Sequence, residues 1–247
     1  MCNYNGIRVT RAQLIELLEK NKMLKQMQIK LRSGFDWSDW PIVKPMLNGD
    51  WEFEMAHWEF VAPWVKTIEA LKESRKKFTT LNATSERLLE SKMFRDAALK
   101  RRCLVLSSGF YEWRHYKPEG EKKPLTYPYH VTVATDQEEP LFLMAGIYQP
   151  WVDTETGEVK NSFAIVTTAA NKIMEQVHNV KKRMPTILPK ELAEEWISEG
   201  LSEERIMEIA SYQFPSDEMR VWPIRKDFRS LEEPWEEFHY DELPELL

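Results

Sequence analysis

Cysteine, histidine and glycine are scarce in this chain of 247 residues, which holds two cysteines, five histidines and eight glycines. Cys2 and Cys103 form no CxxC motif and are too few for a disulfide framework, so we expect a reducing, cytoplasmic environment. The histidines show no paired ligand spacing, which argues against a structural zinc site. We therefore expect neither a metal nor a cofactor.

Long hydrophobic runs are also absent. No apolar run approaches the roughly 18 residues that a membrane span needs, and the N-terminal MCNYNGIRVTR lacks the apolar core of a signal peptide. Hydrophobic residues still make up 43% of the chain and ten residues are tryptophan, which is enough for a real core. We expect a globular monomer without membrane association.

An excess of positive charge is missing as well, since the net charge is −6. The whole chain has 34 basic and 40 acidic side chains, and residues 228–247 contain one of the basic and seven of the acidic ones. Residues 1–227 therefore hold 33 basic and 33 acidic side chains. A neutral body can carry a local basic face, so binding of a polyanion is not excluded. We interpret 1–227 as one domain and 228–247 as an acidic C-terminal tail.

Hydrophobic periodicity predicts more strands than helices. The predicted helices are at 10–22, with Thr10 as N-cap, at 85–102, near 170–178 and near 189–211. The predicted strands are at 51–58, 103–107, 110–115, 127–135, 141–148, 162–168 and 219–224. Helices and strands do not alternate regularly, which favours an α+β fold, a β-rich mixed-sheet single domain with flanking helices, over a parallel βαβ sheet.

Cys2 follows the initiator methionine, which aminopeptidases generally remove when the second residue is small. The product carries an α-amine and a thiol on adjacent carbons. Such an aminothiol attacks an aldehyde through nitrogen, and the sulfur then closes a five-membered thiazolidine. The α-amine has an ordinary pKa of about 7.7–8.0, which leaves a useful neutral fraction at physiological pH. The alternative is a cysteine that occupies this position by accident.

GFYEW, residues 109–113, places Glu112 on a predicted strand, with Phe110 on the same face and Trp113 on the other. Partial burial beside aromatic rings shifts a carboxyl group towards a role in proton transfer. The simpler interpretation is a surface glutamate on an edge strand.

HNVKKRMPTILP, residues 178–189, begins with His178, a residue type suited to general acid catalysis near neutral pH. Lys181, Lys182 and Arg183 follow and offer contacts to phosphates. Taken alone, this segment also fits a solvated histidine in a charged loop.

LNATSE, residues 81–86, and HWEFVAPW, residues 57–64, offer further contacts. The amide of Asn82 is able to hold an amine or a phosphate, although the segment also fits a helix cap. Trp58, Phe60 and Trp64 offer stacking faces for unpaired bases, although we expect at least two of the three to pack in the core.

These segments, in this order and spacing, resemble the SOS-response-associated peptidase (SRAP) family of abasic-site processing proteins. The resemblance extends from Cys2 to about Lys226. HWEFVAPW resembles the family's WGL-x-P-x-W, and NATSE resembles the family's N-A-R-S-E. Further segments then follow in the order that the family has: FRDA, RRCLVLSSGFYEW, LMAGIYQPW, FAIVTTAAN and H…RMP-x-ILP.

The resemblance implies a sensor that crosslinks Cys2 to the aldehyde of abasic sites in single-stranded DNA and shields the lesion during the DNA damage response. Asn82 would orient the N-terminal amine, Glu112 would shuttle protons, and His178 would be the general acid that opens the sugar ring. Removal of Met1 by the protein itself and lyase activity are implied side activities. The protein would be associated with the nucleoid when bound to DNA. The DNA-contacting residues expected from the resemblance are Trp58, Trp64, Thr84, Ser85, Phe110, Trp113, Lys181, Lys182, Arg183, Met184 and Pro185.

The sequence departs from the family pattern where DNA contacts are expected. Asn3 and Tyr4 follow Cys2 where the family has MCGR, and Thr84 replaces the arginine of N-A-R-S-E. The family's H-D-R-M-P is lengthened here by residues that include Lys181 and Lys182, which partly restore the lost positive charge. We expect a complete catalytic set with an altered DNA-binding set.

Two other functions fit the same residues. An N-terminal-nucleophile hydrolase would use Cys2 on a peptide or amide, with an oxyanion hole, and would release an amine. A non-covalent single-stranded DNA-binding module would function without Cys2. For the tail, one hypothesis places its carboxylates and aromatic rings in or near the DNA groove as a mask. The alternatives are a solvated terminus and a segment packed on the outer surface of the domain.

Overall fold

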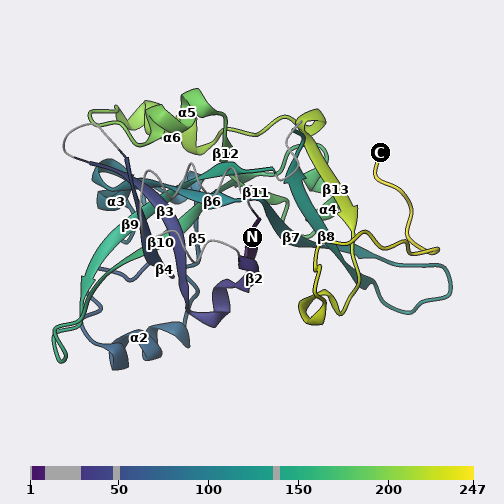
Figure 1. Ribbon diagram of the computed structural model, residues 1–247, viewed down its shortest axis with the longest axis horizontal. Helices are drawn as coiled ribbons and strands as arrows, with labels where there is room; N and C mark the ends of the chain where they lie inside the picture. The colour runs from purple at the N-terminus through teal and green to yellow at the C-terminus, as the bar shows by residue number, and fades with distance from the viewer. Residues whose placement is uncertain (1, 9–28, 47–50, 136–139) are drawn as a thin grey trace.

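The structure is a computed structural model that describes residues 2–8, 29–46, 51–135 and 140–247. The predicted helix at 10–22 lies outside these residues. The described chain forms two sheets with short helices around them, and the N-terminus lies where the two sheets meet (Figure 1). This arrangement confirms the predicted β-rich α+β fold with mixed strand pairing.

The smaller sheet has five described strands, and all of its pairings are antiparallel. The N-terminal strand is an inner strand of this sheet, so the first residues of the chain are held on both sides. The order is β13 (Met219–Pro223), β8 (Leu125–Val133), β7 (Gly109–Tyr116), β1 (Tyr4–Ile7) and β2 (Ile29–Ser33).

The larger sheet curls into a barrel, because β9 and β10 pair with each other as well as with their other neighbours. β10 pairs in parallel with β4 and with β5, whereas the other pairings are antiparallel. The described order is β11 (Arg183–Pro185), β10 (Val159–Ala169), β4 (Trp51–Trp58), β3 (Asp39–Pro45), β6 (Arg102–Ser107), β9 (Phe142–Val152) and β12 (Ile187–Leu188), with β5 (Asn82–Thr84) beside β10.

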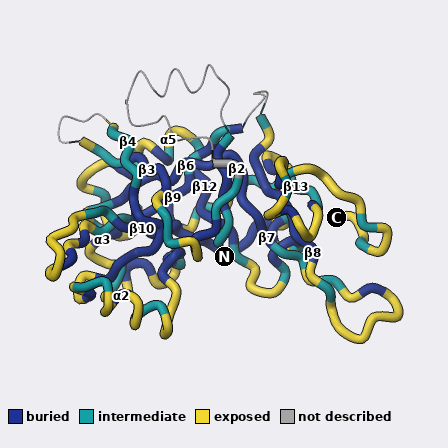
Figure 2. Tube along the Cα trace, turned by 60° about the horizontal axis from the view of Figure 1, so that its bottom comes forward, coloured by how far each residue is buried: buried dark blue, intermediate teal, exposed yellow. Residues whose placement is uncertain are grey.

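Large aromatic side chains fill the barrel. Trp58 is 1% exposed and stacks on Phe163 at 6.3 Å, and its indole N–H donates to the Leu81 carbonyl. The Trp40 indole N–H donates in the same way to the Leu106 carbonyl, so both buried indole N–H groups have a hydrogen-bond acceptor. Figure 2 shows the buried chain concentrated in the strands and the exposed chain in the outer loops.

The helices are short and lie around the barrel and the smaller sheet. Figure 1 shows α5 and α6 on one side of the barrel and α2 on the opposite side. Their bounds are α2 (Ile68–Arg75), α3 (Arg95–Lys100), α4 (Met174–Val177), α5 (Lys190–Trp196) and α6 (Glu203–Ala210), and the 3-10 turns are η2 (Gly34–Asp36), η3 (Ser85–Arg87), η4 (Ser216–Glu218) and η5 (Phe228–Ser230). None of the described helices is long and apolar enough to cross a membrane.

The predicted strands are all present, β4 with the predicted bounds and the others with shifted ends, but the helix predicted at 85–102 was wrong. The segment instead forms η3, turns and α3, and Arg102 already belongs to β6. The buried Arg102 guanidinium donates to carbonyls at the ends of α3 and α5, which fixes both ends in place. The helix predicted near 189–211 divides into α5 and α6, separated by Gly200 with φ +77. The helix predicted near 170–178 is limited to α4.

Candidate active site

The strand β1 carries the N-terminus into the core. Asn5 pairs with Phe110 and Gly6 with Gly109, which places the first residues beside the GFYEW strand. Cys2 is completely buried, and its thiol lies 3.9 Å from the Tyr4 carbonyl. Burial raises the pKa of this thiol, and the charge of Glu112 raises it further. The sulfur is therefore held as a neutral thiol.

A cavity of about 200 Å³ opens beside these residues. It joins the N-terminal segment, β7 and the loop after α4, which are far apart in the sequence. Glu112 and His178 both reach it, so the structure brings together two of the residues predicted to act in proton transfer. The lining residues are Asn3, Glu112, Trp113, His115, His178, Val180 and Lys181.

Glu112 and His178 lie close together in the cavity. Glu112 Oε2 lies 3.7 Å from His178 Nε2, and both side chains are buried. His178 Nδ1 lies 2.8 Å from the Arg183 carbonyl, which can only accept, so Nδ1 carries a hydrogen. In the neutral imidazole the lone pair is then on Nε2, the nitrogen nearer to Glu112.

Burial shifts the two groups in opposite directions, because it disfavours the charged form of each. It raises the pKa of Glu112 to about 7, although the positive charge of Lys181 acts against the shift. It lowers the pKa of His178 to about 4, and Lys181 contributes in the same direction. Near neutral pH the histidine is neutral and the carboxyl group exchanges its proton readily.

Asn82 reaches the same region from β5. Its side-chain N–H donates to the Asn3 side-chain oxygen at 3.2 Å. Its own side-chain oxygen is buried, and no residue in the described part of the chain donates to it. A buried amide oxygen without a donor is costly, so Asn82 offers an acceptor to an incoming N–H group.

The structure separates the predicted DNA-contacting residues into exposed and buried ones. Trp64 is 56% exposed, Lys181 and Lys182 are exposed, and Trp113 and Thr84 are partly exposed. The other aromatic and apolar members of the set, with Ser85, lie in the core, so their burial does not support direct contact with DNA. These buried residues are Trp58, Ser85, Phe110, Met184 and Pro185.

Arg183 is engaged by the protein itself. Its guanidinium pairs with Glu86 and donates to the Thr167 carbonyl, which ties the loop after α4 to the NATSE segment. Its charge is thereby largely neutralised. The backbone of Lys182 has φ +49. Its Nζ lies 3.8 Å from Oε1 of Glu175.

Sequence reasoning missed several residues that shape the cavity. Asn3, His115 and Val180 line it, and the Asn179 side chain clamps the loop to β7 through both backbone groups of His115. Asn179 and Val180 directly follow His178, so position in the sequence was the only available signal.

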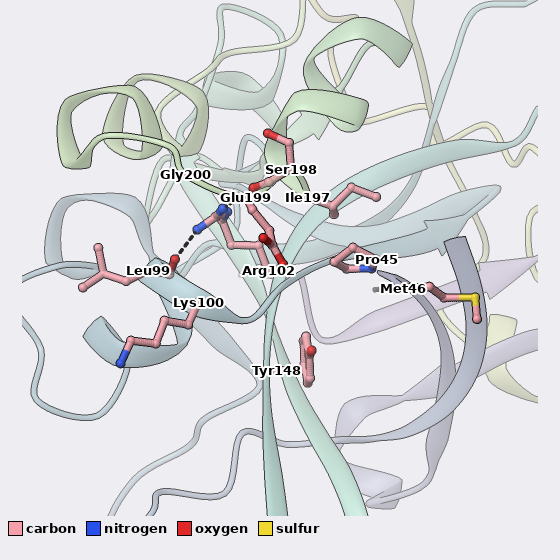
Figure 3. A pocket seen from close by; sticks show the side chains of 10 residues that line it. All are labelled: Pro45, Met46, Leu99, Lys100, Arg102, Tyr148, Ile197, Ser198, Glu199 and Gly200. Atoms are coloured by element: carbon pink, nitrogen blue, oxygen red, sulfur yellow. Dashed lines mark hydrogen bonds between the residues drawn. The ribbon is translucent and has the colours of Figure 1, made fainter. Parts of the chain in front are cut away.

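A larger cavity of about 480 Å³ lies elsewhere, between β3, α3 and the turn after α5 (Figure 3). Its lining includes Arg102, Tyr148 and Glu199, but neither cysteine nor histidine. The guanidinium of Arg102 is used by helix-end carbonyls. This cavity therefore offers no thiol or imidazole, and its buried arginine is used to hold the helix ends.

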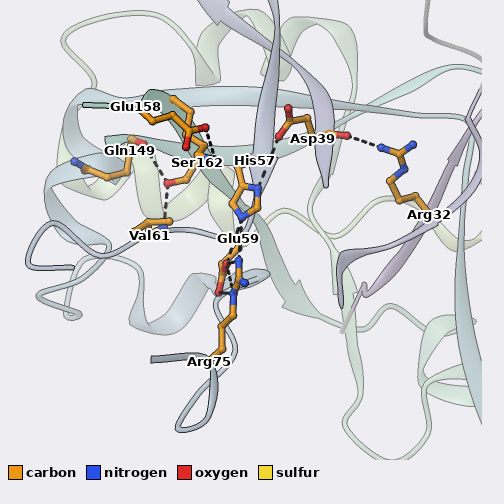
Figure 4. Close-up of polar contacts among 10 residues, drawn as sticks. Arg32, Asp39, His57, Glu59, Val61, Arg75, Gln149, Glu158 and Ser162 are labelled. Carbon is orange, nitrogen blue, oxygen red and sulfur yellow. Dashed lines mark hydrogen bonds and ion pairs between the residues drawn. The ribbon is translucent and has the colours of Figure 1, made fainter. Parts of the chain in front are cut away.

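A second buried polar cluster surrounds His57 on β4 (Figure 4). Glu59 is 2% exposed and forms a bidentate pair with Arg75, and the Arg75 guanidinium stacks over Trp37 at 4.1 Å. Burial acts to lower the pKa of His57, but hydrogen bonds to Asp39 and Glu59 outweigh it and raise the pKa. The cluster is self-satisfied and joins α2 to the barrel. Among the described residues, no group of histidine, cysteine and carboxylate side chains is arranged to hold a metal ion.

The chain matches a protein family and is similar in sequence to several known proteins. The family described as SOS response associated peptidase (SRAP) matches residues 1–231. The chain is 26% identical over 167 residues to "Abasic site processing protein YoqW" of Bacillus subtilis and 30% identical over 162 residues to "Abasic site processing protein HMCES" of Pongo abelii. These matches cover 68% and 58% of this chain, and 66% and 44% of those relatives.

A crystal structure of a protein from Bacteroides thetaiotaomicron has the same fold. Its TM-score is 0.81 at 29% identity, covering 96% of this chain and 100% of that one. A structure from Bordetella bronchiseptica, at 18% identity and a TM-score of 0.69, supports the fold alone; it covers 91% of this chain and 100% of that one.

Proposed function

The chain belongs to the SOS response associated peptidase family, and from that membership and the geometry around Cys2 we propose that it recognises abasic sites in single-stranded DNA and bonds to them covalently. The observation that carries the proposal is the buried Glu112–His178 pair beside an N-terminal cysteine. Relatives of this chain are named abasic site processing proteins.

The reaction uses both nucleophiles of Cys2 after Met1 has been removed. The α-amine adds to the aldehyde carbon of the ring-opened sugar and gives a carbinolamine. Loss of its hydroxyl group as water leaves an imine. The thiol sulfur then adds to the imine carbon, its proton passes to the nitrogen, and a thiazolidine closes. The adduct equals protein plus DNA minus one water.

Glu112 is suited to the proton transfers of these steps. With a pKa of about 7 it is present in both forms at neutral pH. It accepts a proton from the attacking amine and returns one to the departing hydroxyl group, as a general acid–base catalyst requires.

His178 acts together with Glu112. Because the neutral imidazole presents Nε2 as an acceptor, the histidine first takes a proton before it acts as the general acid that opens the sugar ring. Glu112 is the nearby source of that proton. Asn82 would accept a hydrogen bond from the amine and hold it towards the aldehyde.

The buried position of the pair favours an unpaired strand. A sugar reaches the buried pair only when its backbone is free to bend away from a duplex partner, and Trp113 in the cavity lining offers a stacking face to a neighbouring base. The exposed Trp64 offers a second stacking face to an unpaired strand. We expect the protein to act as a monomer in the cytoplasm and to join the nucleoid when bound.

The decisive experiment incubates the protein with a single-stranded oligonucleotide that contains one abasic site, followed by denaturing electrophoresis and intact mass measurement. We expect a heat-stable adduct that has lost one water. The same oligonucleotide with its abasic aldehyde reduced to an alcohol is the substrate control, and Cys103→Ala, which changes the other buried cysteine, is the protein control.

Cys2→Ala and a protein with a permanently blocked N-terminus should give no stable adduct. An adduct of full yield from the blocked protein would overturn the thiazolidine mechanism, because the amine would then be unnecessary.

The family description favours a second candidate, a peptidase that uses the same free N-terminus. Release of an amine from a peptide substrate, without retention of DNA, would identify it. A protein that binds damaged DNA equally well after Cys2→Ala, without ever forming an adduct, would instead be a non-covalent binding module.

A further inference from the structure

The segment after β13 returns over the smaller sheet (Figure 1). Glu237 forms an isolated antiparallel β-bridge with Ile224. The Phe238 N–H donates to the Pro223 carbonyl, and the Tyr240 hydroxyl donates to the Ile224 carbonyl. This part of the segment is therefore held against the end of β13 and the residue that follows it.

Phe228 anchors the beginning of the segment. It is 2% exposed and stacks on Tyr111 at 5.1 Å. Tyr4 packs edge-on against Trp113 at 5.1 Å and lies 6.3 Å from Phe228. This aromatic cluster reaches from the segment to the cavity, because Trp113 lines the cavity.

Arg229 is the next residue, and its guanidinium lies over the ring of Tyr4 at 4.5 Å. Arg229 is exposed and is the one basic residue among the seven carboxylates of residues 228–247. In the described part of the chain, it forms an ion pair with none of these carboxylates. A guanidinium stacked by its face keeps its N–H edges free, and those edges match the oxygens of a phosphate.

We propose that Arg229 binds a backbone phosphate of the DNA strand next to the reacting sugar. The inference rests on the proposed function, because it requires a strand at the cavity. Arg229 lies over Tyr4, which directly follows the cavity residue Asn3 and packs against the cavity residue Trp113. The tail then contributes a cation to DNA binding although its overall charge is negative.

The test measures binding of an undamaged single-stranded oligonucleotide at several salt concentrations, in a Cys2→Ala background that cannot form the adduct. Arg229→Gln should weaken binding about three- to tenfold at low salt and reduce the slope of log K against log salt by about 0.7, the loss of one phosphate contact. Arg229→Lys should keep the slope. The matched control is Arg225→Gln, which removes a nearby arginine paired with Asp227 and should change neither quantity.

An Arg229→Gln protein with unaltered thermal stability, affinity and salt slope would overturn the inference. Equal losses in Arg229→Gln and Arg225→Gln would also overturn it, since they would reflect net charge alone. If Arg229→Gln is unstable, Arg229→Met against Arg225→Met gives the same comparison, because methionine removes the charge and keeps a long side chain over Tyr4. Failure of the proposed function is separate, because it appears as a missing adduct in the unsubstituted protein with abasic DNA.

Discussion

At the scale of single residues, the proposed chemistry depends on a carboxyl group and an imidazole whose pKa values move in opposite directions. Burial is the largest cause of both shifts, since it disfavours a carboxylate and an imidazolium alike. The first two predictions concern Glu112.

Glu112→Gln keeps the shape of the side chain but removes its proton transfer. We expect adduct formation to slow by about 10²–10⁴-fold. The pH dependence of the unsubstituted protein should show an inflection near the Glu112 pKa of about 7, and the variant should lose it. A pH–rate profile with unchanged inflections in both proteins would assign the proton transfers to another group.

The same substitution should stabilise the folded protein at pH 8. A carboxyl group whose folded pKa is raised binds more protons in the folded state, so its contribution falls as the pH rises from the unfolded pKa of about 4.3 to about 7. His178, with its lowered pKa, acts in the opposite direction between about 4 and about 6.5. Melting temperatures of both proteins from pH 5 to 8 would test this, and a variant that melts lower at pH 8 would contradict it.

At the scale of elements, the positively charged residues after α4 lie in two different environments, exposed to solvent or paired within the protein. Lys181 and Lys182 are exposed, and Lys181 lines the cavity, whereas Arg183 joins β11 to Glu86 and Thr167. Neighbouring residues in one basic run should therefore respond differently to substitution.

Lys181→Gln with Lys182→Gln should weaken single-stranded DNA binding about equally for all sequences and flatten its salt dependence. Arg183→Gln should mainly lower the melting temperature, because it leaves Glu86 and the Thr167 carbonyl without their partner. Binding titrations at several salt concentrations, with melting curves of each variant, separate the two effects. A salt slope that only Arg183→Gln changes would reverse the assignment.

The start of β7 requires glycine for a steric reason. A Cβ at Gly109 would lie 2.2 Å from His130 Nε2. The His130 ring cannot easily withdraw, because it is buried against Trp222 at 4.7 Å and Tyr111 at 5.1 Å. Gly109→Ala should cost about 1–3 kcal/mol of stability. Gly120→Asn is the control, because nothing lies within 4 Å of that site and asparagine tolerates its φ of +84.

At the scale of the whole molecule, the final segment packs against the rest of the chain. The Arg8 guanidinium stacks over Trp235 at 4.1 Å, the Tyr127 ring lies 5.0 Å from Tyr240, and the Tyr127 hydroxyl donates to Glu242. A cut after Asp227 would remove the buried Phe228 and uncover Tyr111. A cut after Leu231 is the cleaner test of masking, because it keeps both Phe228 and Arg229.

We expect the chain cut after Leu231 to melt at a lower temperature and to bind undamaged single strands with an affinity within about twofold of the full chain at physiological salt. The reason is that the aromatic side chains of the removed segment are used in packing. A large gain in affinity at low salt that disappears at high salt would show that the acidic segment does mask the DNA site.

The amino-acid sequence by itself determined the strands and indicated the candidate site residues. Alternation of apolar side chains located β4, β6 and β7, and the segments around Cys2, Asn82, Glu112 and His178 indicated the site before any geometry was known. These features are local, since each depends on residue type and spacing within a few positions. The helix predicted at 85–102 failed because local propensity was overridden by burial of the turns and by the long-range bonds of Arg102.

Only the tertiary structure decided which of the predicted site residues line the cavity and which lie in the core around it. Burial placed Trp58, Phe110 and Met184 in the core, and pairing with Glu86 largely neutralised the charge of Arg183. Burial also produced the opposite pKa shifts of Glu112 and His178. The contact of Arg229 with Tyr4, across 225 positions of the sequence, was likewise invisible to local patterns. Solvent exclusion and pairing across strands depend on the whole fold, so no short window of sequence contains them.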